Sequence, residues 1–267
     1  MKIKFGILTG FVLIFALQCS VDDANRRFHE SRSLPSPAAI SVNNLNNFTF
    51  IHLTDIHVLK ERNRHLSAIK SKLVSSDAFI IISGDLTENG QREDFIAYRN
   101  ILNATGIPYL SGIGNHDIFF SGWEFYKKIL GPSVYSTTAG NIRIIVLDSA
   151  GDTLGPDQYE WLKNELKAKT ETFCLVVTHY NFFSPTFFES AQSSNMEEVY
   201  GMMRLFEQYH VNFVLMGHSH IYDFQNINGI GYVVGSAFKE YTDNEQRHFI
   251  RFTVNNGQMS FQRLPLY

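Results

Sequence analysis

The stretch Gly114-Asn115-His116-Asp117 decides how the rest of this chain is interpreted, because it places polar side chains in a tight loop where a strand ends. Residues 107–110 before it have the apolar character of a short buried strand. Ser121-Gly122-Trp123-Glu124 after it has the pattern of a capping box and predicts the start of a helix. Asn115 offers a carbonyl oxygen to a cation, and His116 offers a group that titrates near neutrality. The stretch therefore indicates a site, provided that other ligands meet it.

The same event recurs at other strand ends along the chain. Apolar runs at residues 48–53, 78–82, 173–177 and 213–216 predict buried strands. Each is followed at once by acidic or imidazole side chains, which are Asp55, His57, Asp85, His179, His218 and His220. Loops at strand ends are where open α/β sheets place their sites. With Asn115, these oxygen and imidazole donors suit Mn, Fe, Zn or Co, and they are numerous enough for two ions sharing one carboxylate.

The composition fits one α/β domain of ordinary size. The chain has 267 residues, 44% of them hydrophobic, with a net charge of −3 and two cysteines. No basic block is present, so a nucleic-acid-binding surface is not indicated, and two cysteines make no disulfide framework. Strands alternate with amphipathic helices before a β-rich end with Asn-Gly turns at 228–229 and 256–257. This order predicts a two-layer mixed β-sandwich with helices on both outer faces.

The N-terminus predicts export to the periplasm or the cell surface. Lys2 and Lys4 precede an apolar run at residues 5–17, which is shorter than the about 20 residues that span a bilayer and has the pattern of a secretory signal. Cys19 resembles the lipidated cysteine of a bacterial lipoprotein signal, although Ala16 and Gln18 depart from the usual box. Plain export and an uncleaved anchor are the alternatives to membrane attachment through lipidated Cys19.

Three segments are therefore expected. Residues 1–19 are predicted to be the signal, 20–47 a polar linker, and 48–267 the folded domain.

The strand-end motifs resemble those of the calcineurin-like metallophosphoesterase superfamily. Asp-x-His at 55–57, Gly-Asp at 84–85, Gly-Asn-His-Asp at 114–117, Thr-His at 178–179 and Gly-His-Ser-His at 217–220 occur in the family's order. The resemblance covers residues 48–252 and implies the αββα fold of that family. Residues 84–90, taken with 114–117, are similar to the branch that contains bacterial class III cyclic-nucleotide phosphodiesterases.

The resemblance also implies roles for single residues. It implies that Asp55, His57 and His220 hold one metal ion, that Asn115, His179 and His218 hold the other, and that Asp85 bridges them. A metal-bridging hydroxide then attacks phosphorus, and His116 contacts the phosphate and protonates the departing alkoxide. Glu88 stands where purple acid phosphatases carry a metal-binding Tyr, which disfavours that class.

The expected function is binuclear-metal-dependent hydrolysis of a small-molecule phosphoric ester, with a phosphodiester favoured. A broad-specificity phosphomonoesterase is the rival within the class. A non-catalytic surface-binding lipoprotein is a rival of another class, disfavoured because none of the expected ligands is lost.

Several residues near the motifs have two interpretations. Asp117 either orients His116 or satisfies loop amides, and the second role is favoured. Cys174 and Asp148 are expected to be structural. Aromatic side chains in the loop at 180–195 either stack a base or aryl group or pack beneath the loop, with packing favoured; they are Phe182, Phe183, Phe187 and Phe188.

Overall fold

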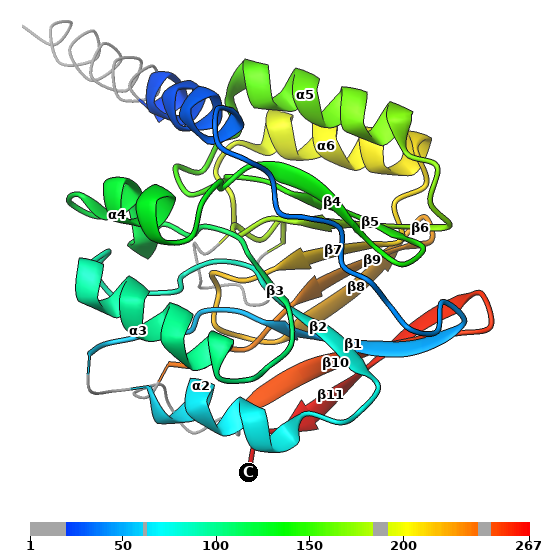
Figure 1. Ribbon diagram of the computed structural model, residues 1–267. Helices are drawn as coiled ribbons and strands as arrows, with labels where there is room; N and C mark the ends of the chain where they lie inside the picture. Colours follow the sequence, from blue (N-terminus) through cyan, green and yellow to red (C-terminus); the bar gives the residue numbers. More distant parts are fainter. Residues whose placement is uncertain (1–19, 61–62, 184–191, 240–246) are drawn as a thin grey trace, which may run out of the picture.

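Two mixed β-sheets face each other in the computed structural model, which describes residues 20–60, 63–183, 192–239 and 247–267 (Figure 1). The first sheet contains β1 (Asn47–Leu53), β2 (Asp77–Ile82), β3 (Tyr109–Ser111), β10 (His248–Asn255) and β11 (Gln258–Pro265), in the order β11-β10-β1-β2-β3. The second contains β4 (Tyr135–Ala139), β5 (Ile142–Val146), β6 (Phe173–Val177), β7 (Phe213–Met216), β8 (Asp223–Ile227) and β9 (Ile230–Val234), in the order β4-β5-β6-β7-β9-β8.

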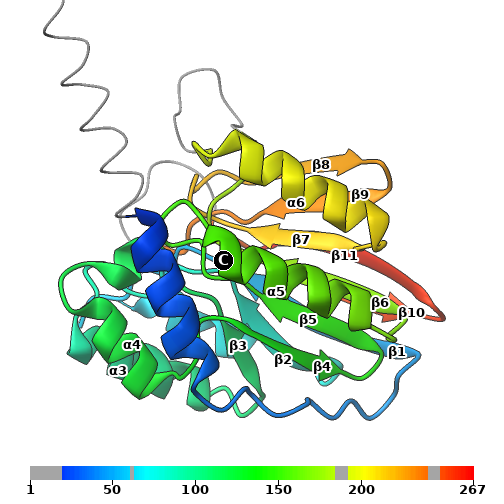
Figure 2. The same ribbon diagram turned by 90° about the horizontal axis from the view of Figure 1, so that it is seen from above.

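Helices cover the outer faces of both sheets (Figure 2). The first sheet carries α2 (Arg64–Ala68), the 3₁₀ turn η1 (Ile69–Lys72), α3 (Arg92–Asn103) and α4 (Gly122–Ile129), while α5 (Gly155–Ala168) and α6 (Met196–Gln208) cover the second. The predicted two-layer sandwich with helices on both faces is therefore confirmed. No helix among the described residues is long and apolar enough to cross a membrane.

The core between the sheets follows from side chains that alternate along each strand. On β1, Phe50 faces the other sheet and its ring stacks on Phe79 and Phe252, with centroids 4.8 Å away in each case. Ile51, its neighbour in the chain, faces the helices of the first sheet instead. Cys174 on β6 is a buried free thiol, as expected, and burial raises its pKa to about 12.

Turns at the β-rich end also match the sequence pattern. Asn228 and Asn256 have φ values of 53° and 47°, and the glycine after each is also left-handed, as two-residue hairpin turns require.

The predicted capping box at the start of α4 is wrong. Ser121 does precede α4, but its side chain makes no capping hydrogen bond, and Glu124 pairs with Lys127 at 2.7 Å. With ψ at 18°, Ser121 lacks the extended backbone that aims a capping oxygen at the helix.

The structure differs from the expected linker at residues 20–32, which form a helix packed between α4 and α5 (Figure 2). Ala24, Arg27, Phe28 and Ser31 are buried. Arg27 and Asp148 each expose 1% of their side chains and form a two-pronged ion pair, with Nε–Oδ2 at 3.0 Å and Nη2–Oδ1 at 3.1 Å. Farther along, the Ile40 amide donates to the Thr138 carbonyl at the edge of β4. Asp148 is thus structural, as expected. The predicted signal segment, which includes Cys19, lies outside the described residues.

Candidate metal centre

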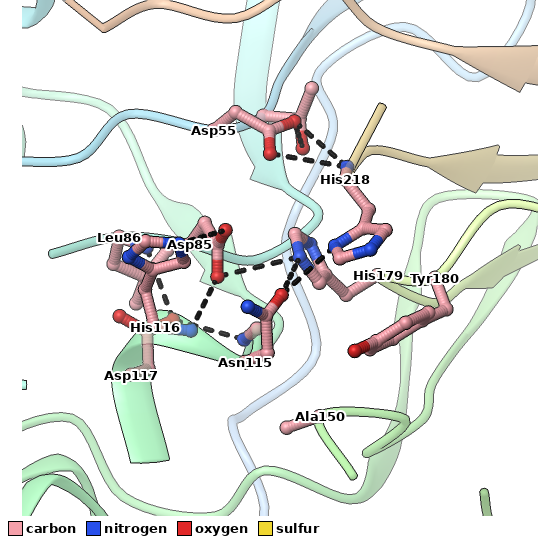
Figure 3. Close-up of polar contacts among 12 residues, drawn as sticks. Asp55, Asp85, Leu86, Asn115, His116, Asp117, Ala150, His179, Tyr180 and His218 are labelled. Carbon is pink, nitrogen blue, oxygen red and sulfur yellow. Dashed lines mark hydrogen bonds and ion pairs between the residues drawn. The ribbon is translucent and has the colours of Figure 1, made fainter. Parts of the chain in front are cut away.

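All seven expected ligands meet at one edge of the sandwich, at the carboxyl ends of the parallel strands β1, β2, β3, β6 and β7. Figure 3 shows five of them, which are Asp55, Asp85, Asn115, His179 and His218. Potential ligand atoms within 4.8 Å of one another form three groups; two of them share Asp85, and the third contains His57, Glu88 and His116. The first group contains Asp55, His57, Asp85 and His220, and the second contains Asp85, His179 and His218. Asn115 joins the second group, because its Oδ1 lies 2.9 Å from His218 Nδ1 and 3.1 Å from His179 Nε2.

Asp85 is the residue that the two groups share. Its Oδ2 lies 3.5 Å from His57 Nε2 in the first group. Its Oδ1 lies 3.4 Å from His179 Nε2 in the second group. The two oxygens of one carboxylate therefore face two different sets of donors, which is the arrangement that a bridging ligand needs.

The backbone of the site is held in an unusual conformation. Asp55, His57, Asp85, His218 and His220 all have φ between 49° and 72°, a left-handed region that costs L-residues about 1–3 kcal/mol each. The close approach of the Asn115 loop to Asp85 also explains why a glycine stands at position 114. A Cβ on Gly114 would lie 2.2 Å from Asp85 Oδ1, so only glycine lets the Asn115 loop approach the Asp85 carboxylate this closely. Strain concentrated at these residues is typical of a functional site.

Buried polar contacts hold the loops in place. Asp117 accepts from the amides of Leu86 at 3.1 Å, Thr87 at 2.9 Å and Gly114 at 3.0 Å, and so ties the Asp85 loop to the Asn115 loop (Figure 3). The favoured structural role of Asp117 is thereby confirmed. His179 Nδ1 lies 3.0 Å from the Ser83 carbonyl, an arrangement in which Nδ1 carries a proton and Nε2 faces Asp85 Oδ1 at 3.4 Å.

The charges at the centre are strongly coupled. Burial alone would raise the pKa of Asp55 and of Asp85. The neighbouring histidines outweigh burial and lower the pKa of both carboxyls; the strongest of these effects comes from His220 for Asp55 and from His179 for Asp85. Burial lowers the pKa of His179, but Asp85, Asp55 and the Ser83 carbonyl together raise it to about 9. Burial and the neighbouring His179 charge lower the pKa of His218 to about 4. The centre thus holds buried carboxylates whose charge must be balanced by protons or by cations.

The donor atoms fit divalent cations. His57 Nε2 lies only 3.1 Å from His220 Nε2, so two ring nitrogens face each other beside the carboxylates of Asp55 and Asp85. A single proton or a cation between the two nitrogens removes the repulsion between their lone pairs. Carboxylate, amide and imidazole donors without thiolate match Mn, Fe, Zn or Co.

His116 lies beside the centre without joining the two groups that share Asp85. Its Nδ1 is 2.7 Å from the backbone carbonyl of Glu88, which turns Nε2 toward the site, 4.0 Å from Asp85 Oδ2. A quarter of the side chain is exposed (25%), so a substrate can reach the ring. These contacts suit a proton donor that faces a bound substrate.

Three side chains at the site were not predicted as functional. Tyr180 stacks on His218 with ring centroids 4.0 Å apart, and Phe119 packs on His116 with centroids 4.8 Å apart. Glu88 Oε2 lies 3.1 Å from His57 Nδ1. The only feature of the sequence that could have indicated a role for Glu88 is its position three residues after Asp85. Phe182 is buried and stacks on Phe206, which confirms packing for that ring, whereas 187 and 188 lie outside the described residues.

Residues 48–222 match the family model described as calcineurin-like phosphoesterase. The chain belongs to this family. It is 24% identical over 234 residues to a 3',5'-cyclic-nucleotide phosphodiesterase from Nostoc sp., covering 80% of this chain and 86% of that protein. It is 23% identical over 192 residues to a probable cyclic nucleotide phosphodiesterase from Xenorhabdus bovienii, covering 64% and 77%. The predicted superfamily is confirmed.

The fold is shared with solved members as well. A dimetal phosphatase from Danio rerio superposes with a TM-score of 0.63 at 14% identity, covering 82% of this chain and 96% of that one. The chain is therefore a phosphoesterase, a hydrolase of phosphoric ester bonds, and the family and its residues indicate a dimetal centre.

Proposed function

We propose that this phosphoesterase hydrolyses a small-molecule phosphodiester, with two divalent or trivalent cations held in the two donor groups. Asp55, His57 and His220 would hold one cation, Asn115, His179 and His218 the other, and Asp85 both. The observation that carries the proposal is the Asp85 carboxylate, whose two oxygens face the two groups. When bound, two such cations activate a water and neutralise charge on the phosphoryl oxygens.

The protein's own contribution to bond cleavage is a positioned proton donor. The Glu88 carbonyl accepts from His116 Nδ1 and so keeps Nε2 pointed at the centre. A protonated Nε2 can give its proton to the departing oxygen, which an alkyl ester needs because an alkoxide is a poor leaving group. Positioned acids of this kind typically contribute about 10²–10⁴-fold to the rate.

Two observations favour a diester over a monoester. A diester carries one negative charge, whereas a monoester carries close to two at neutral pH and needs more cationic neutralisation. Lys239, at the edge of the site, is already paired with Glu88 at 2.9 Å and is not available to a second phosphoryl charge. The relatives named above carry phosphodiesterase names, which supports the same choice.

A substrate panel with a metal titration tests the proposal. Turnover of bis-p-nitrophenyl phosphate, p-nitrophenyl phosphate and 3',5'-cyclic AMP is measured with increasing Mn²⁺ or Zn²⁺, and Asp157→Asn, an exposed carboxylate far from the motifs, serves as the control. The highest kcat/KM should be on a diester. A preference for the monoester would favour the broad phosphomonoesterase. Two bound cations without turnover of any ester would favour the surface-binding protein.

We also propose that the chain is exported and attached to a membrane through Cys19. The basic start, the apolar run at 5–17 and the cysteine after it support this. Ser20, the next residue, bonds the Gly151 carbonyl at 2.8 Å, so an anchor here would hold the domain close to the membrane. Cys19→Ser should move the protein out of the membrane fraction. Retention in that fraction would indicate an uncleaved anchor, and a wild type that is already free would indicate plain export.

A further inference from the structure

Glu88 meets the one face of His57 that the proposed cation does not use. His57 Nε2 points into the centre, 3.5 Å from Asp85 Oδ2 and 3.1 Å from His220 Nε2. On the other side of the ring, Nδ1 lies 3.1 Å from Glu88 Oε2. The side chain of His57 is fully buried, and that of Glu88 is 21% exposed.

We propose that Glu88 is a positioning residue that holds the ring of His57 for cation binding and so sets the affinity of the first donor group. The inference rests on the proposed function, because it takes His57 Nε2 to be a cation ligand. An imidazole that binds a cation through Nε2 must carry its proton on Nδ1, and a carboxylate is a strong acceptor for that proton. Partners of this kind typically change metal affinity by about 10–100-fold.

Neither His57 Nδ1 nor Glu88 Oε2 has another hydrogen-bond partner within the described part of the chain, although His57, Glu88 and His116 together form the third group of potential ligand atoms. His57 Nδ1 and Glu88 Oε2 are both buried, and among the described residues neither forms an aligned hydrogen bond with any group. Their separation is that of an ion pair, without the alignment of a hydrogen bond. When a cation binds Nε2, the proton on Nδ1 would be stabilised by the negative charge of Glu88, so the pair favours cation binding through its charge.

Backbone contacts make this juxtaposition a fixed feature of the fold. The His57 amide donates to the Asp85 carbonyl at 2.9 Å, Val58 to Leu86 at 2.9 Å, and Glu88 to Val58 at 3.2 Å. These bonds join the Asp55–Val58 loop to the Asp85–Glu88 loop and place the two side chains together.

Lys239 then holds the carboxylate. Its Nζ lies 2.9 Å from Glu88 Oε1, which leaves Oε2 for His57. His116 Nδ1 bonds the backbone carbonyl of Glu88, so a side-chain substitution at 88 keeps that bond, although the His116 ring also packs on His57 with centroids 4.5 Å apart.

Mn²⁺ binding to the full-length protein, first stripped with a chelator, tests the role by calorimetry. Glu88→Ala should weaken one of two binding events by about 10–100-fold, leave the other unchanged, and still reach two ions at saturation. Glu88→Gln should lose less, since its amide oxygen can still accept from Nδ1. Glu124→Ala removes a carboxylate that is also paired with a lysine, Lys127 at 2.7 Å, and should leave both affinities unchanged.

Three results would overturn the inference. Wild-type affinity at both sites in Glu88→Ala would mean that the contact does not matter. Saturation at one ion would make Glu88 itself a ligand. Full recovery in Glu88→Ala/Lys239→Met would mean that net charge, and not ring position, was responsible. Failure of the wild type to bind two ions or to hydrolyse any ester would instead refute the proposed function, and the melting temperature of each metal-free variant shows whether it is folded.

Discussion

Replacing Arg27 with Met should destabilise the whole domain, although residue 27 lies in a stretch that the sequence suggests is a linker. Arg27 forms a two-pronged pair with Asp148, and both side chains are 1% exposed. Met fills much of the same volume without a charge, so the main consequence is an uncompensated carboxylate beneath the helix at 20–32.

The size of the loss in stability depends on the hydrogen bonds that Asp148 still accepts after Arg27 is replaced. Removing one partner of a buried pair costs about 3–5 kcal/mol. Asp148 still accepts from Ser133 Oγ at 3.0 Å and from the Ala150 amide at 3.1 Å, which favours the lower end, about 3 kcal/mol. For a domain of this size, each kcal/mol lowers Tm by about 2–4 °C, so a decrease of about 6–12 °C is expected.

Thermal unfolding of the metal-free protein, followed by circular dichroism, measures this decrease. Arg26→Met is the matched control, because Arg26 is half exposed and its pairs with Asp23 and Glu30 belong to a class that contributes about 0–1 kcal/mol. Arg27→Met/Asp148→Asn should recover part of the lost stability, since no buried charge is then left unpaired and an amide oxygen remains to accept from Ser133 or Ala150. Equal Tm values for Arg26→Met and Arg27→Met would refute the reasoning and return residues 20–32 to the role of a linker.

The remaining predictions concern the candidate centre. Asp85→Asn should cost both cations and most of the activity, because it weakens the one ligand common to both groups; two ions retained in elemental analysis with intact turnover would rule out bridging. His116→Ala should retain both cations and lose about 10²–10⁴-fold on an alkyl ester but less on a p-nitrophenyl ester, whose phenol leaves without a proton. Equal losses on the two esters would make His116 a phosphate contact only. Because the pKa of His179 is raised to about 9, its ring holds a proton in the metal-free protein that a cation must displace, so cation affinity should fall about tenfold for each pH unit from 9 down to 7. Calorimetry in buffers of different protonation enthalpy should show this proton release, and affinity that is constant from pH 7 to 9 would contradict it.

The strands and the ligand-bearing loops could be predicted from the sequence because their signals are local. The strands at 173–177 and 213–216 begin and end where the apolar runs do, since strands covered on both faces bury nearly every residue. A ligand histidine then follows two residues after each run, His179 after Val177 and His218 after Met216. Parallel pairing brings the carboxyl ends of the strands to one edge, so five short motifs were enough to predict which side chains would meet.

The helix at 20–32 and the side chains around the ligands depended on the tertiary structure. Ala24, Arg27, Phe28 and Ser31 share one helical face, but Phe28 is the one large apolar residue among them, so the stretch resembles a solvated linker. Its burial depends on Asp148, which is far away in the sequence and supplies the charge that lets an arginine be buried. Three other side chains are likewise understood only from their neighbours in the fold. Glu88 lies beside His57, Tyr180 beside His218, and Phe119 beside His116. Charge pairing and ring stacking act between residues that the fold brings together, and no local pattern encodes such partners.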